Sequence, residues 1–298
     1  MKPSTILKVT GTATAIAGAS VTALYTTSGQ IAKSLIYRYQ KDEVDHSMLL
    51  EKYQGEIVSL VNDMNIKQRG VLIEKPENKK TLFILHPLAL DSSDMILYVD
   101  FFQRKIPDAN ILLIDASAHG ISDGYIRGFG IRDVHDLVAW NRFVLERYGM
   151  EHQMILYGKE MGANTILNTV SLHRLQNIKA VICDGAYTSF SDLLKHRILN
   201  DYRLPVFPVY QFVAKKIKRV ANIEINESTV DLVKHNDVPT LYFHARHDEF
   251  VPLDHVYPLY NANRGHKALF VLKDEHYLYD LKETDEYHET LKEFISKL

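Results

Sequence analysis

The stretch of sequence that decides the fold reads Ile155-Leu156-Tyr157-Gly158-Lys159-Glu160-Met161-Gly162. An apolar run at 154–157 leads into a turn bounded by Gly158 and Gly162, and small residues that suit a helix follow at 163–167. Because glycine has no Cβ, it lets the chain reverse direction where other residues would clash. The pattern therefore predicts a sharp strand-to-helix turn, with Glu160 projecting from the top of a sheet.

A turn of this form is a nucleophile elbow when serine occupies its centre, as in Gly-x-Ser-x-Gly. The serine hydroxyl passes its proton to a histidine and attacks a carbonyl carbon, while backbone amides hold the oxyanion that forms. Glu160 stands in the place of that serine and has no hydroxyl to become an alkoxide. Position 160 is thus predicted to be the reactive position, with an altered side chain.

Short apolar runs alternate with helical patterns on both sides of this turn. Continuous apolar runs bounded by turn residues are typical of strands buried on both faces, as in parallel sheets. We expect strands within residues 57–61, 70–74, 81–85, 110–114, 154–157, 178–183, 240–244 and 268–272. Apolar residues at helical spacing mark helices within 134–145 and 287–298. Such alternation predicts a mostly parallel, doubly wound α/β sheet of about eight strands.

The alternation breaks between Phe190 and Pro239. A proline-interrupted aromatic segment at 202–210 and the basic run Lys215-Lys216-Ile217-Lys218-Arg219 lie there. We expect a small helical cap at about 190–238, inserted over the sheet of a single domain that spans 50–298. The basic run is expected to be the solvated face of a cap helix, with contact to an anionic membrane as the alternative.

Composition excludes some classes of partner. The chain of 298 residues is 46% hydrophobic and 24% charged, as in ordinary soluble globular proteins. Its net charge of -2 does not suggest the basic face that nucleic-acid binding needs, so we expect no such partner. The one cysteine, Cys183, follows apolar residues and is expected to be a buried, inert thiol.

The N-terminal segment is less ordinary. Lys2 and Lys8 precede an uncharged stretch, 9–25, that is similar to the apolar core of a signal peptide or signal anchor. A spanning helix needs ~20 residues, a length that the segment reaches only when extended to residue 32. If 1–32 is an anchor, it holds the protein at the cell membrane with the body outside the cytoplasm. The alternative is an Ala/Thr helix that lies on the body, or is disordered, in a cytoplasmic protein.

Further motifs follow the other expected strands, and their order along the chain indicates a fold family. Asp248 follows the strand at 240–244, and His276 follows the last strand. The order elbow, acid, histidine is the one expected of the α/β-hydrolase fold. Motifs also follow earlier strands, at 86–88, 115–124 and 184–187. Over about 57–298 the chain resembles the α/β-hydrolase superfamily, and most closely the bacterial serine aminopeptidase and monoacylglycerol-lipase-like hydrolases that carry an N-terminal membrane segment.

The resemblance implies a role for each motif. Glu160, Asp248 and His276 would form a triad that lacks its serine, and the amides of Met161 and Leu88 would form the oxyanion hole. Leu88 has to supply the second donor because Pro87, in the place of the usual glycine, has no N–H. The resemblance implies no cofactor. We also expect no metal, because catalytic zinc needs three ligands that meet at one point.

Three chemical roles for Glu160 remain open. It could attack as a carboxylate nucleophile, or act as a general base on water, alone or with His276. Either role would make the protein a hydrolase of ester- or amide-like small substrates with a non-serine mechanism. In the third role, Glu160 and His276 form an ion pair that fills the site. The protein would then be an inactive pseudo-hydrolase that binds a small ligand under the cap or acts as a scaffold.

Overall fold

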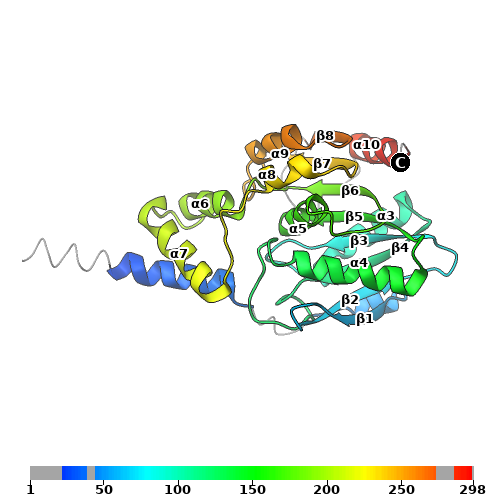
Figure 1. Ribbon diagram of the computed structural model, residues 1–298, viewed down its shortest axis with the longest axis horizontal. Helices are drawn as coiled ribbons and strands as arrows, with labels where there is room; N and C mark the ends of the chain where they lie inside the picture. The colour runs from blue at the N-terminus through cyan, green and yellow to red at the C-terminus, as the bar shows by residue number, and fades with distance from the viewer. Residues whose placement is uncertain (1–21, 39–43, 273–284, 297–298) are drawn as a thin grey trace, which may run out of the picture.

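A computed structural model of the protein describes residues 22–38, 44–272 and 285–296. Its centre is an eight-stranded sheet with the strand order β1-β2-β4-β3-β5-β6-β7-β8 (Figure 1). The strands are β1 (Glu56–Val61), β2 (Lys67–Ile73), β3 (Lys80–Leu85), β4 (Ala109–Asp115), β5 (Gln153–Lys159), β6 (Ile178–Asp184), β7 (Thr240–Ala245) and β8 (Lys267–Leu272). β2 pairs antiparallel with β1 and β4, and the other neighbours are parallel. The predicted mostly parallel sheet is confirmed.

Helices cover both faces of the sheet, which explains why β3, β4, β5, β6 and β7 are buried along most of their length. One face packs against α3 (Ile96–Lys105) and α10 (Asp285–Ser296). The other face packs against α4 (Val134–Tyr148), α5 (Met161–Ser171) and α9 (Val256–Ala262). Shorter helices are α2 (Ser47–Glu51), η1 (Ser92–Met95), α8 (Thr229–Leu232), η2 (Val233–His235) and η3 (Leu253–His255). Alternate side chains of β5 therefore enter two different cores, with Tyr157 on the α3 face and Leu156 on the α4 face.

A third core lies at the carboxyl ends of the strands. It joins α6 (Phe190–Asn200) and α7 (Val206–Ala221) to a helix at 22–36, and these helices form the cap at the left of Figure 1. Tyr25 meets Phe212 edge-on, with 5.4 Å between the ring centroids. Leu88 and Met161, the two expected oxyanion residues, belong to the same core. The cap thus packs directly over the region of the elbow.

The N-terminal helix is joined to the body by its far end. The amide of Arg127 donates to the Ile36 carbonyl at 2.9 Å, and the Arg38 guanidinium donates to the carbonyls of Gly120 and Ser122. From residue 22 onward the segment therefore packs as part of the protein body. The rest of the predicted anchor, 1–21, lies outside the described residues. In the part of the chain that the structure describes, no helix combines the length and apolar character needed to cross a bilayer.

Candidate active site

The structure places Glu160 at the turn between β5 and α5, as the glycine pattern predicts. Its backbone has φ 46° and ψ -111°, a region that non-glycine residues rarely adopt and that is strained. Both glycines are required by close packing. A Cβ on Gly158 would lie 2.5 Å from the Gly162 carbonyl carbon, and a Cβ on Gly162 would lie 2.4 Å from the Leu85 oxygen. The turn therefore has the geometry of a nucleophile elbow.

A buried ion pair lies directly beneath the elbow, and the sequence analysis missed it. The Lys159 ammonium is 3.2 Å from Asp184 Oδ2, and the Tyr157 hydroxyl donates to the same oxygen at 3.0 Å. Burial alone would lower the pKa of Lys159, but the Asp184 carboxylate beside it raises that pKa overall. The Glu160 amide also donates to the Asp184 carbonyl at 2.9 Å. A lysine at the end of an apolar strand is the available signal, because buried lysines are almost always paired.

The expected oxyanion donors lie beside the elbow. After β3, the His86 ring donates from Nδ1 to the Pro87 carbonyl at 2.7 Å and accepts the Ala116 amide at Nε2. Among the described residues, the hydrogen bonds of these turns do not use the amides of Leu88 or Met161. Both residues are almost fully buried. Leu88 and Met161 therefore remain the expected donors, and both lie under the cap core.

His119 fixes the loop that carries Leu88. Its Nε2 lies 3.0 Å from the Leu88 carbonyl oxygen, and its Nδ1 lies 3.0 Å from that of Ser117. Burial holds the pKa of His119 well below its usual value, and the neighbouring His86 and Arg127 lower it further. The neutral ring has one N–H, so it donates to one of the two carbonyls at a time.

The expected acid is held rigidly after β7. Asp248 Oδ1 accepts the amides of Phe250 at 2.9 Å and Val251 at 2.8 Å, and the side chain is buried. Oδ2 lies 3.9 Å from His244 Nε2, which itself donates to the Val251 carbonyl at 2.7 Å. Within the described ranges, no three His, Cys, Asp or Glu side chains are grouped so that they could hold a metal ion.

Glu160 and Asp248 lie at the same edge of the sheet. They follow β5 and β7, which are separated only by β6, so the carboxyl ends of these parallel strands bring them to one side. His276 was predicted to complete the set, and it lies outside the described residues. Its role therefore rests on its place in the chain after β8.

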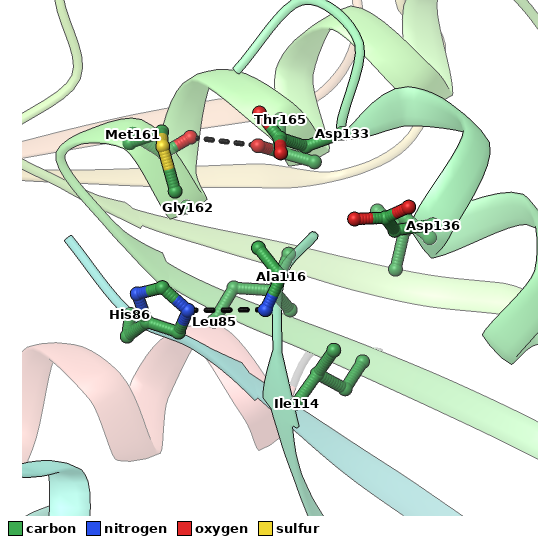
Figure 2. A pocket seen from close by; sticks show the side chains of 10 residues that line it. Leu85, His86, Ile114, Ala116, Asp133, Asp136, Met161, Gly162 and Thr165 are labelled. Carbon is green, nitrogen blue, oxygen red and sulfur yellow. Dashed lines mark hydrogen bonds between the residues drawn. The ribbon is translucent and has the colours of Figure 1, made fainter. Parts of the chain in front are cut away.

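A small cavity lies under the elbow on the α4 face of the sheet (Figure 2). Its volume is about 10 Å³, close to the space that one water molecule needs, so it is too small for a substrate. Asp133 and Asp136 from the start of α4 line it, together with Thr165, whose hydroxyl donates to the Met161 carbonyl. Burial raises the pKa of Asp133 to about 6 and that of Asp136 to about 7. The sequence analysis did not single out these two carboxyl groups.

A second serine, histidine and aspartate come together near η1, but not as a catalytic triad. His46 Nε2 lies 2.7 Å from Ser92 Oγ, and Asp115 Oδ1 accepts the Ser92 amide at 2.7 Å. The other Asp115 oxygen is 3.9 Å from the same nitrogen, Nε2, whereas a triad needs the acid on the opposite ring nitrogen. Ser92 is also fully buried. These contacts therefore tie His46 and Asp115 to η1, and the buried Ser92 hydroxyl has no access to a substrate.

Comparison with known sequences gives two distant relatives. No protein-family model matches the chain. The uncharacterized protein YqkD of Bacillus subtilis is 24% identical over 232 residues, which cover 77% of this chain and 75% of that protein. The uncharacterized membrane protein YNL320W of Saccharomyces cerevisiae is 22% identical over 207 residues, covering 70% of this chain and 67% of that protein.

Solved structures of hydrolases are similar over most of the chain. An esterase of Pyrococcus furiosus has a TM-score of 0.70 at 18% identity, covering 87% of this chain and 98% of its own. The α/β-hydrolase GrgF of a Penicillium species has a TM-score of 0.63 at 13% identity, covering 82% and 98%. The esterase domain of a Rhodothermus marinus protein has a TM-score of 0.56 at 18% identity, covering 82% and 99%. At these identities the similarity shows the fold, which is that of the α/β-hydrolases.

Proposed function

We propose that this α/β-hydrolase-fold protein hydrolyses ester- or amide-like small substrates, with the Glu160 carboxylate activating the attacking water. One observation carries the proposal. Glu160 occupies the centre of an intact elbow, next to the Met161 amide and across from the loop that presents Leu88. A strained backbone at a site whose close packing is otherwise retained is typical of functional positions.

The proposed reaction needs no covalent enzyme intermediate. The substrate carbonyl oxygen accepts the amides of Met161 and Leu88, and a water lies between the Glu160 carboxylate and the carbonyl carbon. The water oxygen forms a bond to that carbon as Glu160 takes the proton, and the amides stabilise the oxyanion. The tetrahedral intermediate collapses when the bond to the leaving group breaks. The proton held by Glu160 passes to that group, which leaves as an alcohol or amine beside a carboxylic acid.

The nucleophilic role and the proposed general-base role of Glu160 place solvent oxygen in different molecules. A carboxylate nucleophile attacks an alkyl carbon of the substrate, breaks the bond from that carbon to its leaving group, and forms an ester between Glu160 and the alkyl group. Water that attacks the Glu160 carbonyl then releases the alcohol and places one solvent oxygen in Glu160. A general base places that oxygen in the released acid instead. Single-turnover hydrolysis in H₂¹⁸O, followed by mass spectrometry of the peptide that contains residue 160, therefore separates the two. Label in Glu160 would replace our proposal by the nucleophilic mechanism.

Substitution of Glu160 separates catalysis from binding. We expect the wild type to hydrolyse p-nitrophenyl esters without labelling by a fluorophosphonate, and Glu160→Gln to lose roughly a hundredfold or more in rate, the lower range for a lost general base. Glu160→Ser should become labelled by the fluorophosphonate. Glu146→Gln, an exposed position on α4, is the matched control and should retain the wild-type rate.

Two outcomes would contradict the proposal. If wild type and Glu160→Gln are equally inactive but bind the same ester analogue, the chain is a pseudo-hydrolase with a binding role. The buried position of Met161 and Leu88 in the cap core fits that second function, because the cap already covers both donors. If the fluorophosphonate labels a wild-type serine such as Ser117 or Ser189, the active site lies elsewhere.

We also propose that the N-terminal segment attaches the protein to a membrane, with Lys2 and Lys8 on the cytoplasmic side and the body outside the cytoplasm. Residues 9–21, which precede the helix that packs in the cap, carry no charge, and the distant yeast relative is described as a membrane protein. Retention in the membrane pellet after carbonate extraction, with the body open to external protease, is expected. Recovery of the whole protein in the soluble cytoplasmic fraction would overturn this proposal.

A further inference from the structure

The outer end of the cap exposes large apolar side chains. Phe207 is 75% exposed, Tyr25 is 62% exposed and Leu199 is 55% exposed. They belong to the start of α7, the start of helix 22–36 and the end of α6, which Figure 1 shows at the same end of the molecule, away from the sheet. We define the cap tip as five of the exposed residues of this end, namely Tyr25, Leu199, Tyr202, Arg203 and Phe207. Single exposed apolar residues are ordinary, but a group of them at one end marks an interaction surface.

The segment that carries most of the cap tip is strongly cationic. Residues 202–223 contain five of the 35 Lys and Arg residues of the chain and none of its 37 Asp and Glu residues. The cations are Arg203, Lys215, Lys216, Lys218 and Arg219. Among the described residues, only Lys218 has an acidic partner, Glu224 at 3.8 Å. A chain that is acidic overall thus carries a cationic segment in its cap, at 202–223.

The packing of α7 decides how it can meet a partner. Its apolar stripe, Val209, Val213, Ile217 and Ala221, is buried inside the cap. That stripe is therefore not available to a membrane or to another protein. The exposed surface consists of the apolar cap tip and, further along α7, the exposed Lys215 and Lys218. Aromatic groups at the outer end with cations behind them suit the boundary of a lipid bilayer, where rings enter the interface and cations meet phosphates.

The uncharged sequence at 9–32 also favours a lipid bilayer as the partner. Helix 22–36 begins at the cap tip, and the 24 residues from 9 to 32 contain no charged side chain. We propose that the cap tip docks on the surface of an anionic phospholipid bilayer, with the basic residues of α7 facing the lipid phosphates. This surface is additional to the attachment proposed for the N-terminal segment. It does not depend on hydrolysis, because none of its residues belongs to the candidate active site.

A fluorescent label can test which side of the bound protein faces the lipid. Cys183 is the only cysteine and is buried, so a cysteine introduced at the surface can be labelled selectively. Phe207→Cys places an environment-sensitive nitrobenzoxadiazole label in the cap tip. Met150→Cys is the matched control, because Met150 is 61% exposed and follows α4, at the edge of the sheet opposite the elbow. Both variants are made in the full chain.

On phosphatidylcholine vesicles with 30% phosphatidylglycerol, we expect the label at 207 to gain at least about twofold in intensity and to shift to shorter wavelength, as for a group leaving water. The label at 150 should not change. Replacing Lys215 and Lys218 by Gln should weaken vesicle binding roughly tenfold or more, since each cation near an anionic surface contributes about fivefold. Circular dichroism establishes that each variant is folded, and Tyr202→Cys replaces Phe207→Cys if that variant is not.

Other results would overturn the proposal. If the protein binds vesicles while the label at 207 stays in water, residues outside the cap tip carry the attachment. If the label changes with protein concentration in the absence of vesicles, the cap tip binds a second copy of the chain. Equal binding to vesicles of pure phosphatidylcholine would remove the role of the cations.

Discussion

Each face of the sheet has a buried acid beneath the elbow, and the two acids differ in the charge of the groups that bind them. On the α3 face, Asp184 has the Lys159 ammonium at 3.2 Å and the Tyr157 hydroxyl at 3.0 Å. On the α4 face, the donors to Asp136 among the described residues are all neutral, namely the side-chain amide of Asn62 and the amide and hydroxyl of Ser117. The first acid is compensated by a charge and the second is not.

The difference indicates that the charge of the partner, more than burial, determines the protonation states of Lys159 and Asp136. Burial is nearly complete in both places. Lys159 nevertheless stays charged because Asp184 raises its pKa against the effect of burial. For Asp136, burial raises the pKa to about 7, and the nearby Asp133 raises it as well. Lys159 therefore keeps its charge at neutral pH, and Asp136 changes charge near neutrality.

The largest effect should follow from breaking the compensated pair. Asp184→Asn leaves the Lys159 ammonium, 6% exposed, without its carboxylate partner. We expect the free energy of unfolding to fall by about 3–5 kcal/mol, measured by urea denaturation at pH 7. Asp108→Asn is the control, because the Asp108 carboxylate is 65% exposed and pairs with Lys80 at the surface. It should cost about 1 kcal/mol or less, and an equal loss in both variants would contradict the comparison.

The uncompensated acids should instead make stability depend on pH. The folded-state pKa of Asp136 is about 7 and that of Asp133 is about 6, both above the usual 3.8. The folded state therefore holds these protons more tightly. Their contribution is complete below pH 4 and is lost as pH rises through 6 and 7. We expect Asp136 to lower the free energy of unfolding by on the order of 3 kcal/mol between pH 4 and 8.

Buried histidines change the free energy of unfolding with pH in the opposite direction. A variant of Asp136 is therefore needed to isolate the effect of this carboxyl group. Burial lowers the pKa of His255 to about 4 and that of His119 well below its usual value, so their contribution is lost as pH falls. Asp136→Asn cannot ionise, and the difference between wild type and this variant isolates the carboxyl group. The measurement is urea denaturation of both proteins at several pH values from 4 to 8. Parallel curves would show that Asp136 keeps its usual pKa.

A smaller effect on stability should follow from removing the hydroxyl that donates to Asp184. Tyr157→Phe removes the hydroxyl that donates to Asp184 while the ring continues to fill the core. We expect a loss of about 2 kcal/mol in the free energy of unfolding, because the hydrogen bond is buried and its acceptor is charged. In Tyr148→Phe the lost bond goes to Glu74 at the surface, and about 1 kcal/mol or less is expected. Thermal denaturation ranks the two, and a larger loss for Tyr148→Phe would contradict the assignment.

Much of the fold could be predicted from local patterns. All eight predicted strands are present with bounds within a few residues, because strands buried on both faces read as continuous apolar runs. The elbow was predictable because Gly158 and Gly162 are required by clashes that any Cβ would make there. Chain order also placed Asp248 at the same sheet edge as Glu160.

The rest depends on contacts between distant parts of the chain, which a linear pattern does not contain. Helix 22–36 has the composition of an anchor segment, and only its packing against α7 shows that it belongs to the cap. The partnership of Lys159 with Asp184 depends on the pairing of β5 with β6, which places these residues opposite each other. Asp133 and Asp136 look like ordinary acidic residues at the start of a helix, and only the tertiary packing buries them.

The place of helix 22–36 in the cap also determines when this helix can pack during protein synthesis. Its apolar side chains, such as Ile31 and Leu35, pack in one core with Val213 and Ile217 of α7. The ribosome must extend the chain from residue 36 to residue 221 before that partner is complete, which takes roughly 10–40 s at ~5–20 residues per second. Throughout this interval helix 22–36 lacks its partner α7. It is therefore among the first segments to leave the ribosome and among the last to reach its final position.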